Sequence, residues 1–130
     1  MARLRNGGAL AGILLLALAG CAGQAEDLKA PTLQRAEYVL SVAAINTLKE
    51  IRVGGDELCP INERGALLVF AGTATGPADG AYLDVNGTRI KAGDVFLTGE
   101  QSDIDGGFDC GGEHFENARR VLVEEITLSE

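Results

Sequence analysis

The chain has 130 residues, enough for one domain with a usable hydrophobic core. It carries 19 acidic residues against 11 Lys and Arg, a net charge of −8 at pH 7. This excess argues against nucleic-acid binding and against a domain lying flat on anionic lipid, because both need a basic face; solubility is its simplest explanation, although a cation or basic partner is permitted.

The first 20 residues have the pattern of a secretory signal peptide. Arg3 and Arg5 precede residues 7–20, which carry no charge and include an apolar run over residues 9–19. A transmembrane helix needs roughly 20 apolar residues, so this run is too short to span a bilayer. A basic start, a short apolar run and a small-residue exit predict export, with residues 1–20 removed.

The exit from this segment, Leu18-Ala19-Gly20-Cys21, resembles the lipobox of bacterial lipoproteins. The resemblance implies that the Cys21 sulfur is lipidated, that cleavage occurs before Cys21, and that fatty acyl chains such as palmitate hold the protein on a membrane. Two or more chains anchor stably, whereas one binds reversibly. Ala22 stands where an Asp would favour inner-membrane retention in enterobacterial lipoproteins, which implies the outer membrane, facing the periplasm. The alternative is an ordinary secreted protein with an incidental cysteine.

The rest of the chain then divides into a tether and a domain. Residues 21–31 are small and polar and end at Pro31, which predicts a flexible tether; such a chain spans roughly 15 to 20 Å. Residues 32–130 are expected to form a single globular β-rich domain. Loss of Arg3 and Arg5 leaves 9 Lys and Arg against 19 acids, a net charge of −10.

Residues 32–53 are ambiguous. Thr32 is a candidate helix cap, and apolar residues then recur at helical spacing, which gives an α+β alternative with a helix at about 32–48. Residues 38–45 also read as a buried strand, and residues 49–53 alternate like a strand before Gly54-Gly55-Asp56. Strand is the favoured prediction for 49–53, whereas helix and strand stay open over 33–45.

The remaining segments predict β-structure. Asn86-Gly87 is the strongest hairpin indication, because both turn positions require a positive φ. Five or six short strands with turns between them predict a mainly β fold, a small barrel or sandwich, with the OB type as one possibility. We expect strands at 66–71 (buried on both faces), 81–85, 88–91, 95–98 and 119–128, with loops at 54–65 and 100–118.

Two cysteines lie in the expected domain. With Cys21 assigned to lipid, Cys59 and Cys110 are an even remainder in an exported protein, which predicts a disulfide. A closed loop of this length contributes about 4 kcal/mol by the chain-entropy model. The alternative is two free thiols. A zinc site is poorly supported, because only His114 could join them and no CxxC pair exists.

The segment from 100 to 116 contains six acids and no Lys or Arg. Calcium prefers several carboxylate and carbonyl oxygens on a chain that can wrap around it, so Asp103, Asp105 and Asp109 are candidate ligands. The spacing does not match an EF-hand, since Gly107 and His114 stand where ligands belong. The simpler interpretation is a solvated acidic loop held by the disulfide.

Catalytic chemistry has little support in the sequence. His114, the only histidine, would have a raised pKa beside these acids. No Gly-x-Ser-x-Gly elbow, HExxH, phosphate loop or dinucleotide fingerprint occurs. Phe108 and Phe115 are candidates for contact with a partner, or they fold inward over the disulfide. The sequence thus predicts a non-enzymatic envelope lipoprotein, a binding or structural module for another envelope protein or an envelope polymer, that needs no cofactor. Calcium binding and a small hydrolase are the alternatives.

Overall fold

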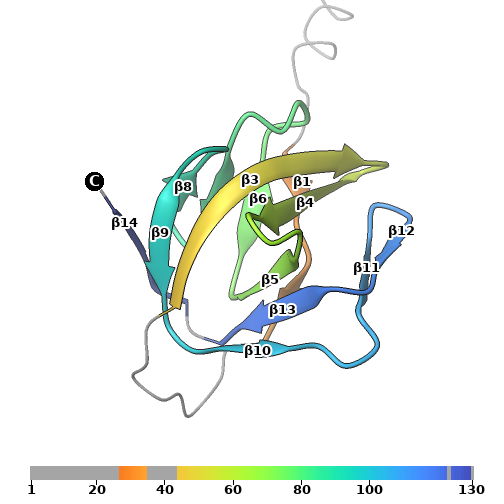
Figure 1. The fold of residues 1–130 in the computed structure, drawn as a ribbon. Helices are drawn as coiled ribbons and strands as arrows, with labels where there is room; N and C mark the ends of the chain where they lie inside the picture. The colour runs from red at the N-terminus through yellow and green to blue at the C-terminus, as the bar shows by residue number, and fades with distance from the viewer. Residues whose placement is uncertain (1–26, 35–43, 123, 130) are drawn as a thin grey trace, which may run out of the picture.

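Every regular element in the computed structural model is a β-strand, across the ranges that it describes, residues 27–34, 44–122 and 124–129 (Figure 1). The mainly β prediction is therefore confirmed. In chain order the strands are β1 (Leu28–Lys29), β2 (Thr32–Leu33), β3 (Ala44–Gly54), β4 (Glu57–Asn62), β5 (Leu67–Ala71), β6 (Ala74–Gly76), β7 (Leu83–Val85), β8 (Thr88–Ile90), β9 (Val95–Thr98), β10 (Gln101–Asp103), β11 (Phe108–Cys110), β12 (Glu113–Phe115), β13 (Ala118–Val121) and β14 (Ile126–Leu128).

Eight of these strands follow one another around a nearly closed barrel (Figure 1). The pairings run β8–β7–β6–β1–β4–β3–β9–β14, and β14 returns to contact β8. The inward side chains of these strands, with those of β5 and β13, form the main core. Its buried members are Ala30, Leu48, Leu58, Leu68, Phe70, Ala74, Leu83, Val85, Ile90, Phe96, Val121 and Ile126.

Strand β5 separates this core from a second, smaller one. Its five residues are all buried, as predicted for a strand covered on both faces. Leu68 and Phe70 point into the barrel core, while Leu67 and Val69 point the other way. There they meet Cys59 and Ile61 of β4, Ala118 of β13, and Cys110 and Phe115 of the β11–β12 hairpin. That hairpin is hydrogen-bonded as a separate two-stranded sheet.

The predicted Asn86-Gly87 hairpin is confirmed between β7 and β8. Asn86 has φ 51° and Gly87 has φ 95°, the left-handed values that this tight turn requires. The Asn86 side chain adds long-range contacts: Oδ1 accepts from the Thr73 amide at 2.8 Å, and Nδ2 donates to the Ala71 carbonyl at 2.8 Å. Asn86 thus fixes a turn and joins two neighbouring segments to it.

Two predictions for the N-terminal part are corrected. The helix alternative at 32–48 is wrong at both described ends of that range, which form β2 and the start of β3; residues 35–43 lie outside the described residues. The tether predicted for 21–31 ends earlier, because Leu28 and Lys29 insert as β1 between β4 and β6. The strand predicted at 49–53 is confirmed as part of β3.

Three predictions for later segments are also corrected. The loop expected at 54–65 contains β4, which is buried almost throughout and so lacks the alternation that marks a strand. The loop expected at 100–118 contains β10, β11 and β12 and the first residue of β13. The strand expected at 119–128 is divided, because β13 pairs with β5 and β10 whereas β14 pairs with β9. No helix in the described part of the chain is long and apolar enough to cross a membrane.

Candidate functional site

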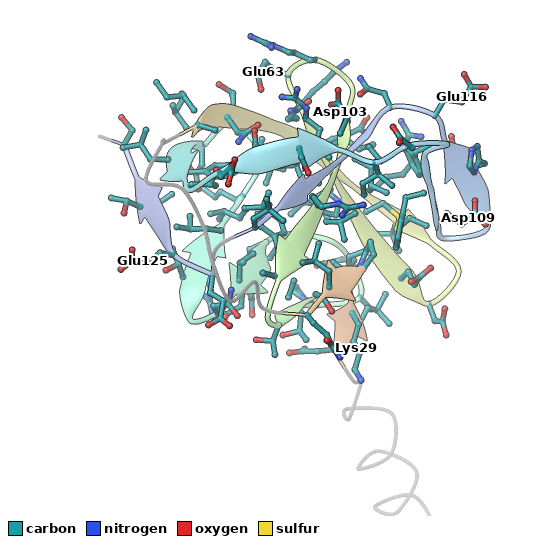
Figure 2. The ribbon with its side chains drawn as sticks, turned by 90° about the horizontal axis from the view of Figure 1, so that it is seen from below. Lys29, Glu63, Asp103, Asp109, Glu116 and Glu125 are labelled. Carbon is teal, nitrogen blue, oxygen red and sulfur yellow. A yellow bond between two sulfur atoms is a disulfide. The ribbon has the colours of Figure 1, made fainter. Side chains whose placement is uncertain are left out.

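The candidate calcium ligands are spread over separate elements. Asp103 lies on β10 opposite Arg119 of β13, and Arg119 Nε donates to Asp103 Oδ1 at 2.9 Å. Asp105 lies in the turn that follows, and Asp109 lies on β11. Figure 2 shows Asp103 and Asp109 at different places on the surface. Within the described ranges, no three His, Cys, Asp or Glu side chains gather as a metal site. Calcium binding stays a prediction.

His114 pairs with Asp109 across the β11–β12 hairpin. The two residues are register partners, and His114 Nδ1 lies 2.6 Å from Asp109 Oδ1. The hydrogen bond to Asp109 raises the pKa of His114 above its ordinary value, and the charge on Asp109, the Gly106 carbonyl and Glu116 act in the same direction. Both side chains are largely exposed, at 53% and 82%.

Beside this pair the surface is slightly hollowed. The shallow depression there is lined by Gly107, Phe108, Asp109 and His114. None of these side chains is a hydroxyl or thiol nucleophile, which a histidine base would need for covalent catalysis. The Asp109–His114 pair joins the two strands of this exposed hairpin.

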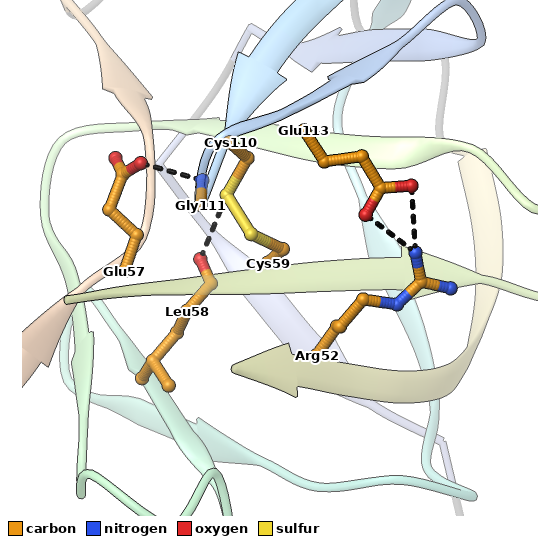
Figure 3. Close-up of a disulfide and its surroundings, with 7 residues drawn as sticks. All are labelled: Arg52, Glu57, Leu58, Cys59, Cys110, Gly111 and Glu113. Carbon is orange, nitrogen blue, oxygen red and sulfur yellow. Dashed lines mark hydrogen bonds and ion pairs between the residues drawn. A yellow bond between two sulfur atoms is a disulfide. The ribbon is translucent and has the colours of Figure 1, made fainter. Parts of the chain in front are cut away.

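The hairpin is attached to the barrel by a cluster of contacts around the predicted disulfide (Figure 3). Cys59 of β4 and Cys110 of β11 are bonded, which confirms that prediction. Arg52 Nη1 donates to both carboxylate oxygens of Glu113, at 3.0 and 3.1 Å, and the Gly111 amide donates to Glu57 Oε1 at 2.8 Å. These contacts hold the hairpin against the end of the β3–β4 pair.

Backbone packing at this junction requires glycine. A Cβ atom on Gly54 would lie 2.8 Å from the Gly111 carbonyl oxygen, and one on Gly111 would lie 2.9 Å from Gly54 Cα. Gly111 also has φ 62°. The backbone segments that contain Gly54 and Gly111 therefore approach each other more closely than a Cβ atom on either residue would allow.

The two phenylalanines of the hairpin face inward. Phe108 and Phe115 are register partners, and both pack in the second core, where Phe115 is buried and Phe108 partly so. The guanidinium carbon of Arg52 lies 5.6 Å from the centre of the Phe115 ring. Of the two alternatives for these rings, the structure shows the inward one, over the disulfide.

A different surface stands out on the barrel wall formed by β3, β9 and β14, which lie side by side in Figure 1. Ile45 is opposite Leu97, Thr47 is opposite Val95, and β14 continues both rows. Alternate residues on these strands point inward, as the buried Phe96 does. The outward residues, here called the uncharged face, are Ile45, Thr47, Val95, Leu97, Thr127 and Ser129.

The sequence did not reveal this surface. Val95 and Leu97 were read as part of a strand, but alternation alone does not say which side faces the core when both sides are uncharged. Ile45 lay in the segment left open between helix and strand. Arg52 was also missed as a partner of Glu113, because the two are distant in sequence. Cys21, the predicted lipidation site, lies outside the described residues.

Comparison of the chain with protein-family models, with curated proteins and with solved structures finds no match.

The His114–Asp109 contact gives a pH prediction. Folding raises the pKa of His114 above its ordinary value of about 6.5. The contact therefore stabilises the fold fully below about pH 6.5, and this stabilisation is lost as the pH rises through the pKa of His114 in the folded protein. Asp109→Asn should bring the pKa of His114 back towards about 6.5. A proton NMR titration of the imidazole measures this directly, with Glu116→Gln as the control that changes it less. An equal His114 pKa in the wild type and Asp109→Asn would contradict the assignment.

Proposed function

We propose that this chain is a bacterial envelope lipoprotein, anchored through Cys21, whose β-barrel is a non-enzymatic binding module for another envelope protein. The uncharged face is the surface proposed to make the contact. The proposal rests on one observation, which is that this face has no charged side chain although charged residues are common in the chain.

Six outward positions across three adjacent strands carry no charge, although 23% of the residues in the chain are charged. Ile45 is 66% exposed, and Val95 and Leu97 are each 36% exposed. Isolated exposed aliphatic residues are common, but neighbouring ones that form a contiguous patch mark interaction surfaces. Burying these three side chains against a partner would remove apolar surface from water. A charged group lies at the edge of the face, where Glu63 Oε1 accepts from the Thr47 amide at 3.0 Å.

The acidity of the chain favours a different protein over a second copy or a lipid surface. Two copies of the chain without residues 1–20, each with a net charge of −10, repel one another, and so do this chain and an anionic bilayer. Leu28, where the sheet starts, comes seven positions after Cys21, a reach of at most about 25 Å. A lipid at Cys21 would therefore keep the domain close to the membrane and to partners located there.

The anchor is tested by Cys21→Ser. Cells fed an alkyne-bearing palmitate should label the wild-type chain, and Cys21→Ser should lose that label, because the sulfur is the first acceptor of lipid. Ala22→Ser, a matched change at the next residue, should keep it. Labelling of Cys21→Ser at the wild-type level would overturn the proposed anchor.

The binding face is tested by site-specific photo-crosslinking in intact cells. A crosslinker at Ile45 or Leu97 should capture a discrete envelope protein, and Ile45→Lys should abolish capture from position 97. Val53 is the matched control, since it lies on the same strand, is also aliphatic and is 42% exposed, but is not part of the uncharged face. Equal capture from positions 45 and 53, or capture of a second copy alone, would contradict the proposal.

A further inference from the structure

A separate groove lies on the opposite side of β5 from the barrel core. It has a volume of about 390 Å³, and its lining includes Leu33 of β2, Val69 of β5, Ile104, Phe108 of β11, and Arg120 and Leu122 from β13 and its end. Gln34 also lines it. Small-molecule sites commonly occupy about 300 to 1,000 Å³ and combine apolar walls with few polar groups. This groove therefore has the size and composition of a site for one small amphipathic molecule.

The strand register places Arg120 at this groove. Arg120 is opposite Val69 in the parallel β13–β5 pairing and opposite Ser102 in the antiparallel pairing with β10. Residues directly opposite in a sheet share a face, so Arg120 stands on the side of β5 that carries Val69. Arg119, one residue earlier, points to the other face and is bound by Asp103.

Arg120, like Arg64, has no charged or aromatic partner among the described residues, whereas Arg52, Arg89 and Arg119 each have one. Arg52 is bound by Glu50 and Glu113, and the guanidinium carbon of Arg89 lies 3.8 Å from the centre of the Tyr82 ring. Within the described ranges, Arg120 makes no ion pair. An unpaired guanidinium beside an apolar groove, in a chain with net charge −8, is suited to a carboxylate, which it can bind through two parallel hydrogen bonds.

We propose that this groove binds a single-chain fatty acid, with its carboxylate on Arg120 and its hydrocarbon chain against Leu33, Ile104, Phe108 and Leu122. The Gln34 amide is the second polar group that can donate to the carboxylate. A volume of about 390 Å³ accommodates one chain and not a diacyl lipid. Fatty-acid binding in this groove is separate from the proposed protein contact, because it uses a different face of the domain.

The positive charge of Arg120 distinguishes a fatty acid from other amphiphilic ligands of the same length. A cationic amphiphile would place like charge against Arg120, and an alcohol of the same length would leave the guanidinium without an anion. An anionic bilayer presents the same acidic chemistry as a fatty acid, but the net negative charge of the chain opposes its approach. The ligand is therefore expected to enter as a monomer.

The test uses residues 21–130 with Cys21→Ser, which include every strand of the fold, with the disulfide intact. Isothermal titration with monomeric decanoate should show saturable one-to-one binding. Arg120→Gln should weaken it by about tenfold or more, the effect of losing charge-assisted hydrogen bonds. Arg64→Gln removes the same charge from an exposed turn outside the groove and should leave the affinity unchanged. Ile104→Ser, checked for folding by circular dichroism, should also weaken binding.

Decanol, decylammonium and vesicles of anionic phospholipid complete the comparison. Decanoate should bind more tightly than decanol or decylammonium, and the vesicles should not bind. The proposal is overturned if decanoate shows no saturable binding, if Arg120→Gln and Arg64→Gln have equal effects, if decanol binds as tightly as decanoate, or if only vesicles bind. Ile45→Lys should leave decanoate binding unchanged, so failure of the groove and failure of the uncharged face are distinguishable.

Discussion

The Cys59–Cys110 bond is the constraint on which the second core depends. It joins β4 to a hairpin that has no strand pairing with the rest of the sheet. The closed loop, 51 residues in sequence separation, restricts the unfolded chain and contributes about 4 kcal/mol by the chain-entropy model. The Arg52–Glu113 ion pair is exposed and contributes little by comparison. Without the disulfide, the hairpin would be held by non-covalent contacts alone, chiefly the packing of Phe115 in the second core and the Gly111–Glu57 hydrogen bond.

The double-sided burial of β5 determines where binding surfaces can form. One side fills the barrel, which leaves the wall made by β3, β9 and β14 free to carry the uncharged face on its outside. The other side is covered by the hairpin at one end, and the groove with Arg120 lies beside that cover. The proposed protein contact and the proposed fatty-acid site thus arise from two layers of one fold, and the disulfide is expected to matter mainly for the second.

Sequence predicted those features that are encoded by neighbouring residues. Asn86-Gly87 specifies its own turn through positive φ, and the apolar run of β5 specifies burial on both faces. The Cys59–Cys110 disulfide was predictable because the chain is expected to be exported and because two cysteines remain once Cys21 is assigned to lipid. By contrast, β10, β11 and β12 are only three residues long and lie next to glycine-containing turns, and β4 contains Pro60. These strands form because distant partners supply hydrogen bonds and cover, which local periodicity does not record.

The candidate sites show the same division. The acids of residues 100–116 were visible as a cluster in sequence, but the sheet places Asp103 beside Arg119 and Asp109 beside His114. The residues that these acids contact are therefore set by strand pairing and not by their neighbours in the sequence. The uncharged face combines β3 with β9 and β14, and the groove combines β2, β5, β11 and β13, so neither exists as a sequence motif. Charge composition restricted the kind of partner, whereas the surfaces themselves required the strand register.

Hydrogen exchange in the disulfide-bonded domain and in Cys59→Ala/Cys110→Ala tests most directly whether this bond holds the second core. The account predicts that amides of the β11–β12 hairpin and of β13 lose protection in the variant, while amides of the β7–β8 hairpin and of β9 keep most of theirs. Unchanged protection in the hairpin, or an equal loss in every strand, would contradict it.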